Sequence, residues 1–198
     1  MVGSQSQKKE FVVHKNTLCR DSPFFRAACG REWKEGQEKK IRLRDTAPEI
    51  FNLYVHWLHK ENIDTDLLPD DESEESRFLS LGKMLILANF IGDETLTDKM
   101  IDIFLINLEG TTVGIGPDTF NYIWSRTPPN SGIQRLLLDI GAAGLQPHNI
   151  GLLATRYPPE LTKSLAERFV MDAEKEWPTY EDRCKYHSHK AGEGTCKG

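Results

Sequence analysis

The stretch that decides the fold begins with residues 11–28, which read FVVHKNTLCRDSPFFRAA. Its first three residues, Phe11, Val12 and Val13, are of types common in β-strands. The residues that follow have apolar side chains at helical spacing. Ser22 suits the N-cap of a helix, and Pro23 suits the first helical position. From Phe24 onward, apolar residues recur at i, i+3 and i+4, which is typical of a helix with one apolar face. We therefore predict a strand followed by a helix.

Residues 40–60, which read KIRLRDTAPEIFNLYVHWLHK, repeat this order. Residues 40–44 alternate between polar and apolar side chains with period 2, as a half-buried strand does. Thr46 and Glu49 have the spacing of a capping box and are predicted to open a helix that reaches about Lys60. Because that helix is apolar over most of its circumference, we expect it near the middle of the core.

The order and spacing of these segments resemble a BTB/POZ domain, in the form found in fungal BTB proteins. The resemblance covers roughly residues 2–109 and implies a protein-interaction fold of the α+β class. The expected architecture is a small β-sheet flanked by a helical bundle, followed by a helical C-terminal extension. Residues 1–3 resemble the last part of a first strand that the family carries in full, so that strand is expected to be truncated.

The composition of the chain suggests three successive regions. We expect the BTB/POZ domain over residues 1–109, with an acidic loop at 64–76. Residues 117–177 contain three candidate helices and are predicted to form the helical extension. Residues 178–198 form a tail that contains cysteine and histidine.

The charge and cysteine content point to a protein of the cytoplasm or nucleus. With 25 basic and 30 acidic residues the net charge is −5, which argues against nucleic acid as the main partner. No stretch approaches the roughly 20 apolar residues of a membrane span, and the N-terminus lacks a signal-peptide pattern. Cys19 and Cys29 lie in segments predicted to be helical, so we expect free thiols rather than a secreted disulfide framework.

The tail contains a candidate metal site. Cys184, His187, His189 and Cys196 place two thiols and two imidazoles within 13 residues, and this is a ligand set for tetrahedral zinc. The spacing is not that of a standard zinc finger, although a similar Cys-His tail is part of the resemblance to fungal BTB proteins. The alternative is a polar tail with incidental cysteine and histidine, and no other cofactor is expected.

The sequence contains no recognisable catalytic set. There is no Gly-x-Ser-x-Gly elbow. Paired carboxylates occur only in the acidic loop, where nothing would desolvate them and shift a pKa. We therefore expect a protein that is not an enzyme.

The resemblance implies a substrate adaptor for a cullin-type ubiquitin ligase. Family members of that kind frequently carry an apolar-x-Glu motif, and Trp33-Lys34-Glu35 fits its position. The Trp33 side chain would fill a pocket on the cullin scaffold, while the Glu35 carboxylate would accept charge-assisted hydrogen bonds. Alternatively, Trp33 packs on its own domain and Glu35 is solvated. The alternative function is a self-associating scaffold, or a transcription-linked interaction protein, without a ligase role.

Overall fold

The computed structural model of the chain describes residues 1–3, 8–30, 34–38, 40–64, 68, 74–109, 115–144, 154–171 and 176–188. The chain divides into two compact units, Met1–Thr97 and Asp98–Gly198, and each is described by itself. In the described part of the chain, no helix is both long enough and apolar enough to cross a membrane.

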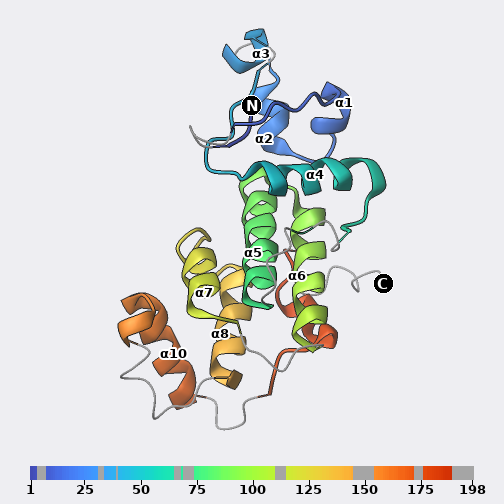
Figure 1. Ribbon diagram of the computed structural model, residues 1–198. Coiled ribbons are helices and arrows are strands. Elements are labelled where there is room, and N and C mark those ends of the chain that lie inside the picture. The colour runs from blue at the N-terminus through green and yellow to red at the C-terminus, as the bar shows by residue number, and fades with distance from the viewer. Residues whose placement is uncertain are drawn as a thin grey trace. The chain divides into compact units, whose positions relative to one another are not determined.

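The first unit is helical (Figure 1). Its helices are α1 (Lys15–Leu18), α2 (Pro23–Ala28), α3 (Lys34–Glu38), α4 (Pro48–Lys60), α5 (Glu74–Ile91) and the start of α6 (Glu94–Glu109). Helix α4 packs against α1 and α5, and α2 also packs against α5. The predicted central position of α4 is confirmed, because seven of its residues from Pro48 to Leu58 are buried.

Local capping chemistry explains where the helices of the first unit begin. The Phe25 amide donates to Ser22 Oγ at 3.1 Å, so Ser22 caps α2 as predicted. Ser22 Oγ also donates to the Ile91 carbonyl at 2.6 Å, which fixes the start of α2 to the end of α5. The predicted capping box of α4 is wrong: its N-cap is Ala47, without a side-chain cap. Pro48 suits the first helical position and shifts the start beyond Thr46.

The predicted β-sheet is wrong, because the described residues contain no strand. The two segments expected to be strands are extended but irregular. Among the described residues two isolated bridges form, Val2 with Lys9 in antiparallel orientation and Val2 with Leu43 in parallel orientation. Of the described residues, 1–3 lie between the two segments, and three residues are too few to form a ladder with either of them. The described fold is therefore helical, and the α+β assignment does not hold for it.

The second unit is built around α8 (Gly132–Gly144). Its other elements are the rest of α6, α7 (Pro117–Trp124), α10 (Pro159–Met171) and the 3₁₀ helix η3 (Tyr180–Lys185). Helix α8 packs against α7 and α10. The core side chains that these helices bury include Phe120, Ile133, Leu137, Ile140, Leu161 and Leu165. The described residues after α10, from 176 to 179, are not helical.

Candidate partner-binding site

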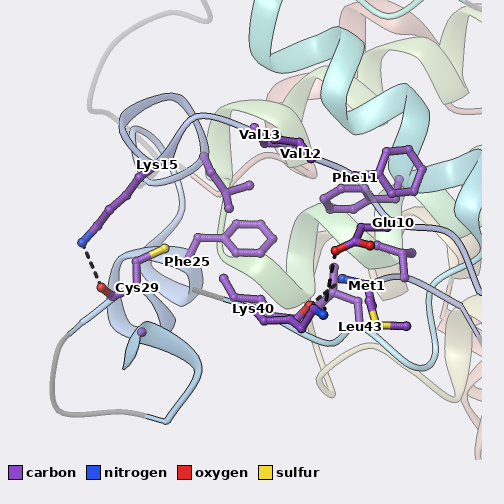
Figure 2. Close-up of a pocket in the computed structure, with 15 residues that line it drawn as sticks. Met1, Glu10, Phe11, Val12, Val13, Lys15, Phe25, Cys29, Lys40 and Leu43 are labelled. Atoms are coloured by element: carbon purple, nitrogen blue, oxygen red, sulfur yellow. Dashed lines mark hydrogen bonds and ion pairs between the residues drawn. The ribbon is translucent and has the colours of Figure 1, made fainter. Parts of the chain in front are cut away.

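The first unit contains a cavity of about 590 Å³ between two extended segments (Figure 2). One wall is formed by residues 10–13 and the other by residues 40, 41 and 43. Met1 and Val2 also line the cavity, with Phe25 and Phe51 contributing aromatic surface. The remaining lining residues are Lys15, Leu18, Cys29 and Gly36. We call this feature the strand cavity.

Aromatic packing holds the first wall of the strand cavity in place. The Phe11 ring meets the Phe51 ring edge-on, with centroids 5.0 Å apart, and this contact fixes the segment onto α4. The next side chain, Val12, is 97% exposed. This alternation between an inward and an outward side chain is that of an extended segment. Among the described residues, Phe11 and Val12 have no backbone hydrogen-bond partner.

Residues 1–3 begin a β-ladder on both sides. Val2 and Lys9 exchange two backbone hydrogen bonds of 2.9 Å. On the other side, the Leu43 amide donates to the Met1 carbonyl at 3.0 Å, and the Gly3 amide donates to the Leu43 carbonyl at 2.9 Å. The Met1 ammonium adds one more bond, to the Ile41 carbonyl at 2.8 Å. These residues therefore lie between the two extended segments and are hydrogen-bonded to both.

The charges at the strand cavity are mixed and partly exposed. Lys40 Nζ lies 3.9 Å from Glu10 Oε1, as the dashed line in Figure 2 marks. Because the two side chains are 42% and 66% exposed, this pair contributes little to stability. Burial lowers the pKa of the Met1 ammonium; Glu10 opposes this shift, and Lys40 and Arg42 add to it.

Two free thiols lie beside the cavity. Cys19 and Cys29 are half-buried free thiols, as predicted. Cys19 Sγ donates to the Phe25 carbonyl at 3.4 Å, and the same carbonyl accepts the Cys29 amide at 2.9 Å. Burial, helped by a hydrogen bond with the Cys29 side chain, raises the pKa of the Cys19 thiol to about 11. At neutral pH the Cys19 side chain is therefore protonated.

The predicted partner-binding motif falls mostly outside the described residues. Trp33 is not among them, and for Glu35 the structure describes the backbone, which belongs to α3, but not the side chain. Helix α3 approaches the end of α2 closely at Gly36. A Cβ atom added to Gly36 would lie only 1.9 Å from the Gly30 carbonyl oxygen. The role of Trp33 and Glu35 stays a prediction.

The predicted zinc ligands are divided in the same way. Cys184 and His187 lie in the described part of the chain, whereas His189 and Cys196 lie outside it. Cys184 is in a disulfide bond, and a sulfur in that state is not a thiolate ligand. His187 is 8% exposed, and its Nε2 lies 3.0 Å from Asp102 Oδ1. The described residues hold no group of three metal ligands, and the four-ligand site stays a prediction.

Residues 176–188 pack against α6 and α8 and are hydrogen-bonded to side chains of both helices. The Tyr180 amide donates to Glu109 Oε1 at 2.7 Å, and the Ser188 amide donates to Asp98 Oδ1 at 2.9 Å. The Tyr186 hydroxyl donates to Asp139 Oδ2 at 2.9 Å. Burial raises the pKa of this hydroxyl, and the nearby Asp139 carboxylate adds to the shift. Sequence reasoning missed these contacts, because nothing local marks Asp139 as a partner of the tail.

Comparison of the sequence with known protein families identifies one matching segment of the chain. Residues 2–92 match the BTB/POZ domain family. The resemblance expected from the sequence is thereby confirmed over these residues, whereas its fungal form is not shown. The BTB/POZ domain is a protein-interaction domain and not a catalytic one, so this segment is a protein-interaction module. All residues that line the strand cavity, except Met1, lie within it.

Two curated relatives are similar to a shorter part of the chain. Kelch-like protein 40 of Xenopus tropicalis is 34% identical over 58 residues, which is 29% of this chain and 9% of that protein. Kelch-like protein 40 of Xenopus laevis is 33% identical over 58 residues, with the same coverage. The chain thus matches less than a tenth of the length of these relatives. No solved structure matches the chain.

Proposed function

We propose that this protein is a substrate adaptor for a cullin-type ubiquitin ligase and that it binds the cullin scaffold through α3 and the residue before it. The match to the BTB/POZ family supports a protein-interaction role, and the similarity to Kelch-like proteins supports an adaptor within that class. The apolar-x-Glu motif is the feature that carries the proposal. Glu35 is the second residue of α3, and Trp33 directly precedes the helix.

The close approach of Gly36 to Gly30 supports a fixed position of α3, which carries Glu35 of this motif, relative to α2. A helix of five residues is marginal by itself in water, so α3 depends on its packing. Gly30 comes directly after Cys29, the C-cap of α2, and its amide donates to the Ala27 carbonyl at 2.9 Å. Because backbone meets backbone at Gly36, the position of α3 is tied to that of α2. A binding element fixed before association loses less conformational entropy on binding.

The test is a calorimetric titration of the protein with the N-terminal domain of a cullin. We expect micromolar binding that is lost in both Trp33→Ala and Glu35→Ala. Glu49→Ala is the matched control, because it removes an exposed glutamate at the start of another helix of the same unit. Its affinity should equal that of the unchanged protein.

The titration is also made with Gly36→Ala, which keeps both Trp33 and Glu35. The added methyl group cannot be accommodated against the Gly30 carbonyl without moving α3, so we expect weaker cullin binding by about tenfold or more. Circular dichroism of each variant would verify that the helical content is retained. Absence of heat with the unchanged protein would refute the adaptor proposal. A stable homodimer without cullin affinity would instead favour a self-associating scaffold.

A further inference from the structure

We propose that Cys19 and Cys29 are a redox-active thiol pair, which forms an intramolecular disulfide when it reacts with a small anionic disulfide such as oxidised glutathione. The inference goes beyond the adaptor function and does not depend on cullin binding. It rests on where α1 and α2 end, on the contacts that hold these two ends together and on the charges beside them.

The two cysteines occupy equivalent positions at the ends of consecutive helices. Cys19 is the C-cap of α1, and Cys29 is the C-cap of α2. Both are free thiols and both residues are half-buried. Each residue is therefore partly accessible to a small molecule, and neither sulfur is already used in a disulfide.

Two basic side chains tie the helix ends together in a reciprocal way. Lys15 Nζ, from α1, donates to the Cys29 carbonyl at 2.9 Å, as the dashed line in Figure 2 marks. Arg26 Nη1, from α2, donates to the Cys19 carbonyl at 3.3 Å. Basic side chains commonly bond the last carbonyls of a helix, and here each one bonds the end of the other helix. The backbones of the two cysteines are therefore held together before any oxidation.

The side chain of Cys19 is directed toward Cys29. Cys19 Sγ donates to the Phe25 carbonyl at 3.4 Å, and the same carbonyl accepts the Cys29 amide at 2.9 Å. The Cys19 thiol is also hydrogen-bonded to the Cys29 side chain. A disulfide joins its two sulfur atoms at about 2.05 Å. Its formation therefore requires two side chains that are already in contact to move closer.

The reaction exchanges one disulfide for another. Cys19 is protonated at neutral pH, so we assign the first attack to the Cys29 thiolate, which forms a mixed disulfide with glutathione and releases one glutathione thiolate. The Cys19 sulfur, after losing its proton, then attacks the Cys29 sulfur. The bond between Cys29 and glutathione breaks, and the second glutathione leaves. The two protein thiols lose two electrons and two protons, which the two glutathione thiols gain.

The charges beside the pair favour an anionic co-reactant. Lys15 and Arg26 are exposed, and both act to lower the pKa of the Cys19 thiol, against the larger effect of burial. Oxidised glutathione is an anion at neutral pH, whereas cystamine is a disulfide that carries two ammonium groups. We expect oxidised glutathione to react about threefold faster or more, after each rate is divided by that with the neutral thiol 2-mercaptoethanol.

The test equilibrates the full chain with glutathione buffers of graded redox ratio, followed by acid quenching, alkylation of the remaining thiols and mass spectrometry. Trypsin places the two cysteines on separate peptides, residues 16–20 and 27–31, so a cross-link between these peptides reports the disulfide directly. We expect an equilibrium constant for disulfide formation that is at least about tenfold larger in the folded chain than in concentrated urea, because the fold holds the thiols together.

Cysteine variants assign the two roles. Cys19→Ser should abolish the cross-link and retain the mixed disulfide at Cys29, while its hydroxyl can still donate to the Phe25 carbonyl. The matched control combines Ala27→Cys with Cys29→Ser, which moves one thiol to an exposed position two residues earlier, within α2. That position faces another direction of the helix, so we expect at least about tenfold less cross-link. Circular dichroism would establish that each variant is folded.

The proposal would be overturned by absence of the cross-link in the folded chain at oxidising ratios, or by an equilibrium constant no larger than in urea. Equal cross-linking in the Ala27→Cys control would also overturn it. A normalised rate with cystamine that equals or exceeds the rate with oxidised glutathione would overturn the anionic class of the co-reactant. None of these measurements involves a cullin, so they stand or fail independently of the adaptor proposal.

Discussion

Two irregular segments of the molecule, residues 8–13 in the first unit and residues 176–188 in the second, differ in how their backbone groups are satisfied. In the second segment, the amides of Tyr180 and Ser188 donate to carboxylates of α6. In the first segment, Lys9 is paired, whereas Phe11 and Val12 have no backbone partner among the described residues. The second segment is thus hydrogen-bonded to side chains of its own unit, whereas the first has unpaired backbone groups within the described part of the chain.

The difference lies in how many backbone groups of each segment are hydrogen-bonded within the described part of the chain. Most buried backbone groups in proteins are hydrogen-bonded, and an unpaired strand edge is a template for another strand. Side chains of their own unit stabilise residues 176–188 by hydrogen bonds. Residues 10–13 line a cavity, and Phe11 and Val12 have no backbone partner in the described ranges. The following experiments would break or sharpen this contrast.

The largest effect on stability is expected where the tail meets α8. A Cβ atom added at Gly132 would lie only 1.7 Å from the Tyr186 carbonyl oxygen, so Gly132→Ala should displace the tail. We expect a loss of about 3 kcal/mol in the free energy of unfolding, measured in urea. Gly144→Ala is the matched control, since its nearest neighbour is the outer edge of the Trp177 ring at 2.8 Å, which can shift. Equal losses in both variants would contradict the tight docking at Tyr186.

A further large effect is expected on the rate at which the Cys19 thiol, beside the strand cavity, is alkylated. Since the pKa of the Cys19 thiol is raised from 9.0 to about 11, its thiolate fraction at pH 7.5 should be about 100-fold smaller than that of an unperturbed thiol. Alkylation by iodoacetamide, followed by mass spectrometry of the Cys19 peptide, should be correspondingly slow. The rate should rise with pH up to about 11. Fast alkylation at pH 7.5 would show that the thiol is not buried in this way.

An intermediate effect is expected for the tyrosine that fastens the tail. Tyr186→Phe removes the hydroxyl that donates to Asp139 at 2.9 Å and keeps the buried ring. We expect a loss of about 1 kcal/mol in urea unfolding, because Asp139 retains its ion pair with Arg168 at 2.6 Å. Tyr180→Phe is the matched control, because its backbone amide, not its hydroxyl, makes the tail contact. A larger loss in the control would overturn this assignment.

The smallest effect is expected at the strand cavity itself. Glu10→Gln removes the charge that faces Lys40 across the cavity, at 3.9 Å between exposed groups. The free energy of unfolding should change by less than about 0.5 kcal/mol. The same urea titration measures it. A loss above 1 kcal/mol would mean that this pair closes the cavity, which would contradict an open site.

Local chemistry in the sequence predicted part of this structure and long-range pairing accounts for the rest. The Ser22 cap was predictable because its hydrogen bond closes within three residues. The sheet was predicted wrongly, because alternation at residues 40–44 indicates an extended conformation and does not supply a neighbouring strand. The strand cavity depends on the register of Val2 with Lys9 and Leu43, and no motif encodes that register.

The same limit applies to the tail. The residue types of the predicted zinc ligands are visible in the sequence, but the partners of the tail are far away along the chain. His187 meets Asp102 at a separation of 85 residues, and Tyr186 meets Asp139 at a separation of 47. The sequence offers many equivalent carboxylates, and only tertiary packing selects these two.

The hydrogen bond from Met1 to Ile41 has a consequence for covalent modification of the chain. Acetylation of Met1 would replace the ammonium with an amide, which can still donate to the Ile41 carbonyl. The hydrogen bond at this nitrogen would therefore survive acetylation, whereas its positive charge would not. Loss of that charge would remove its repulsion from Lys40 and Arg42 and its attraction to Glu10.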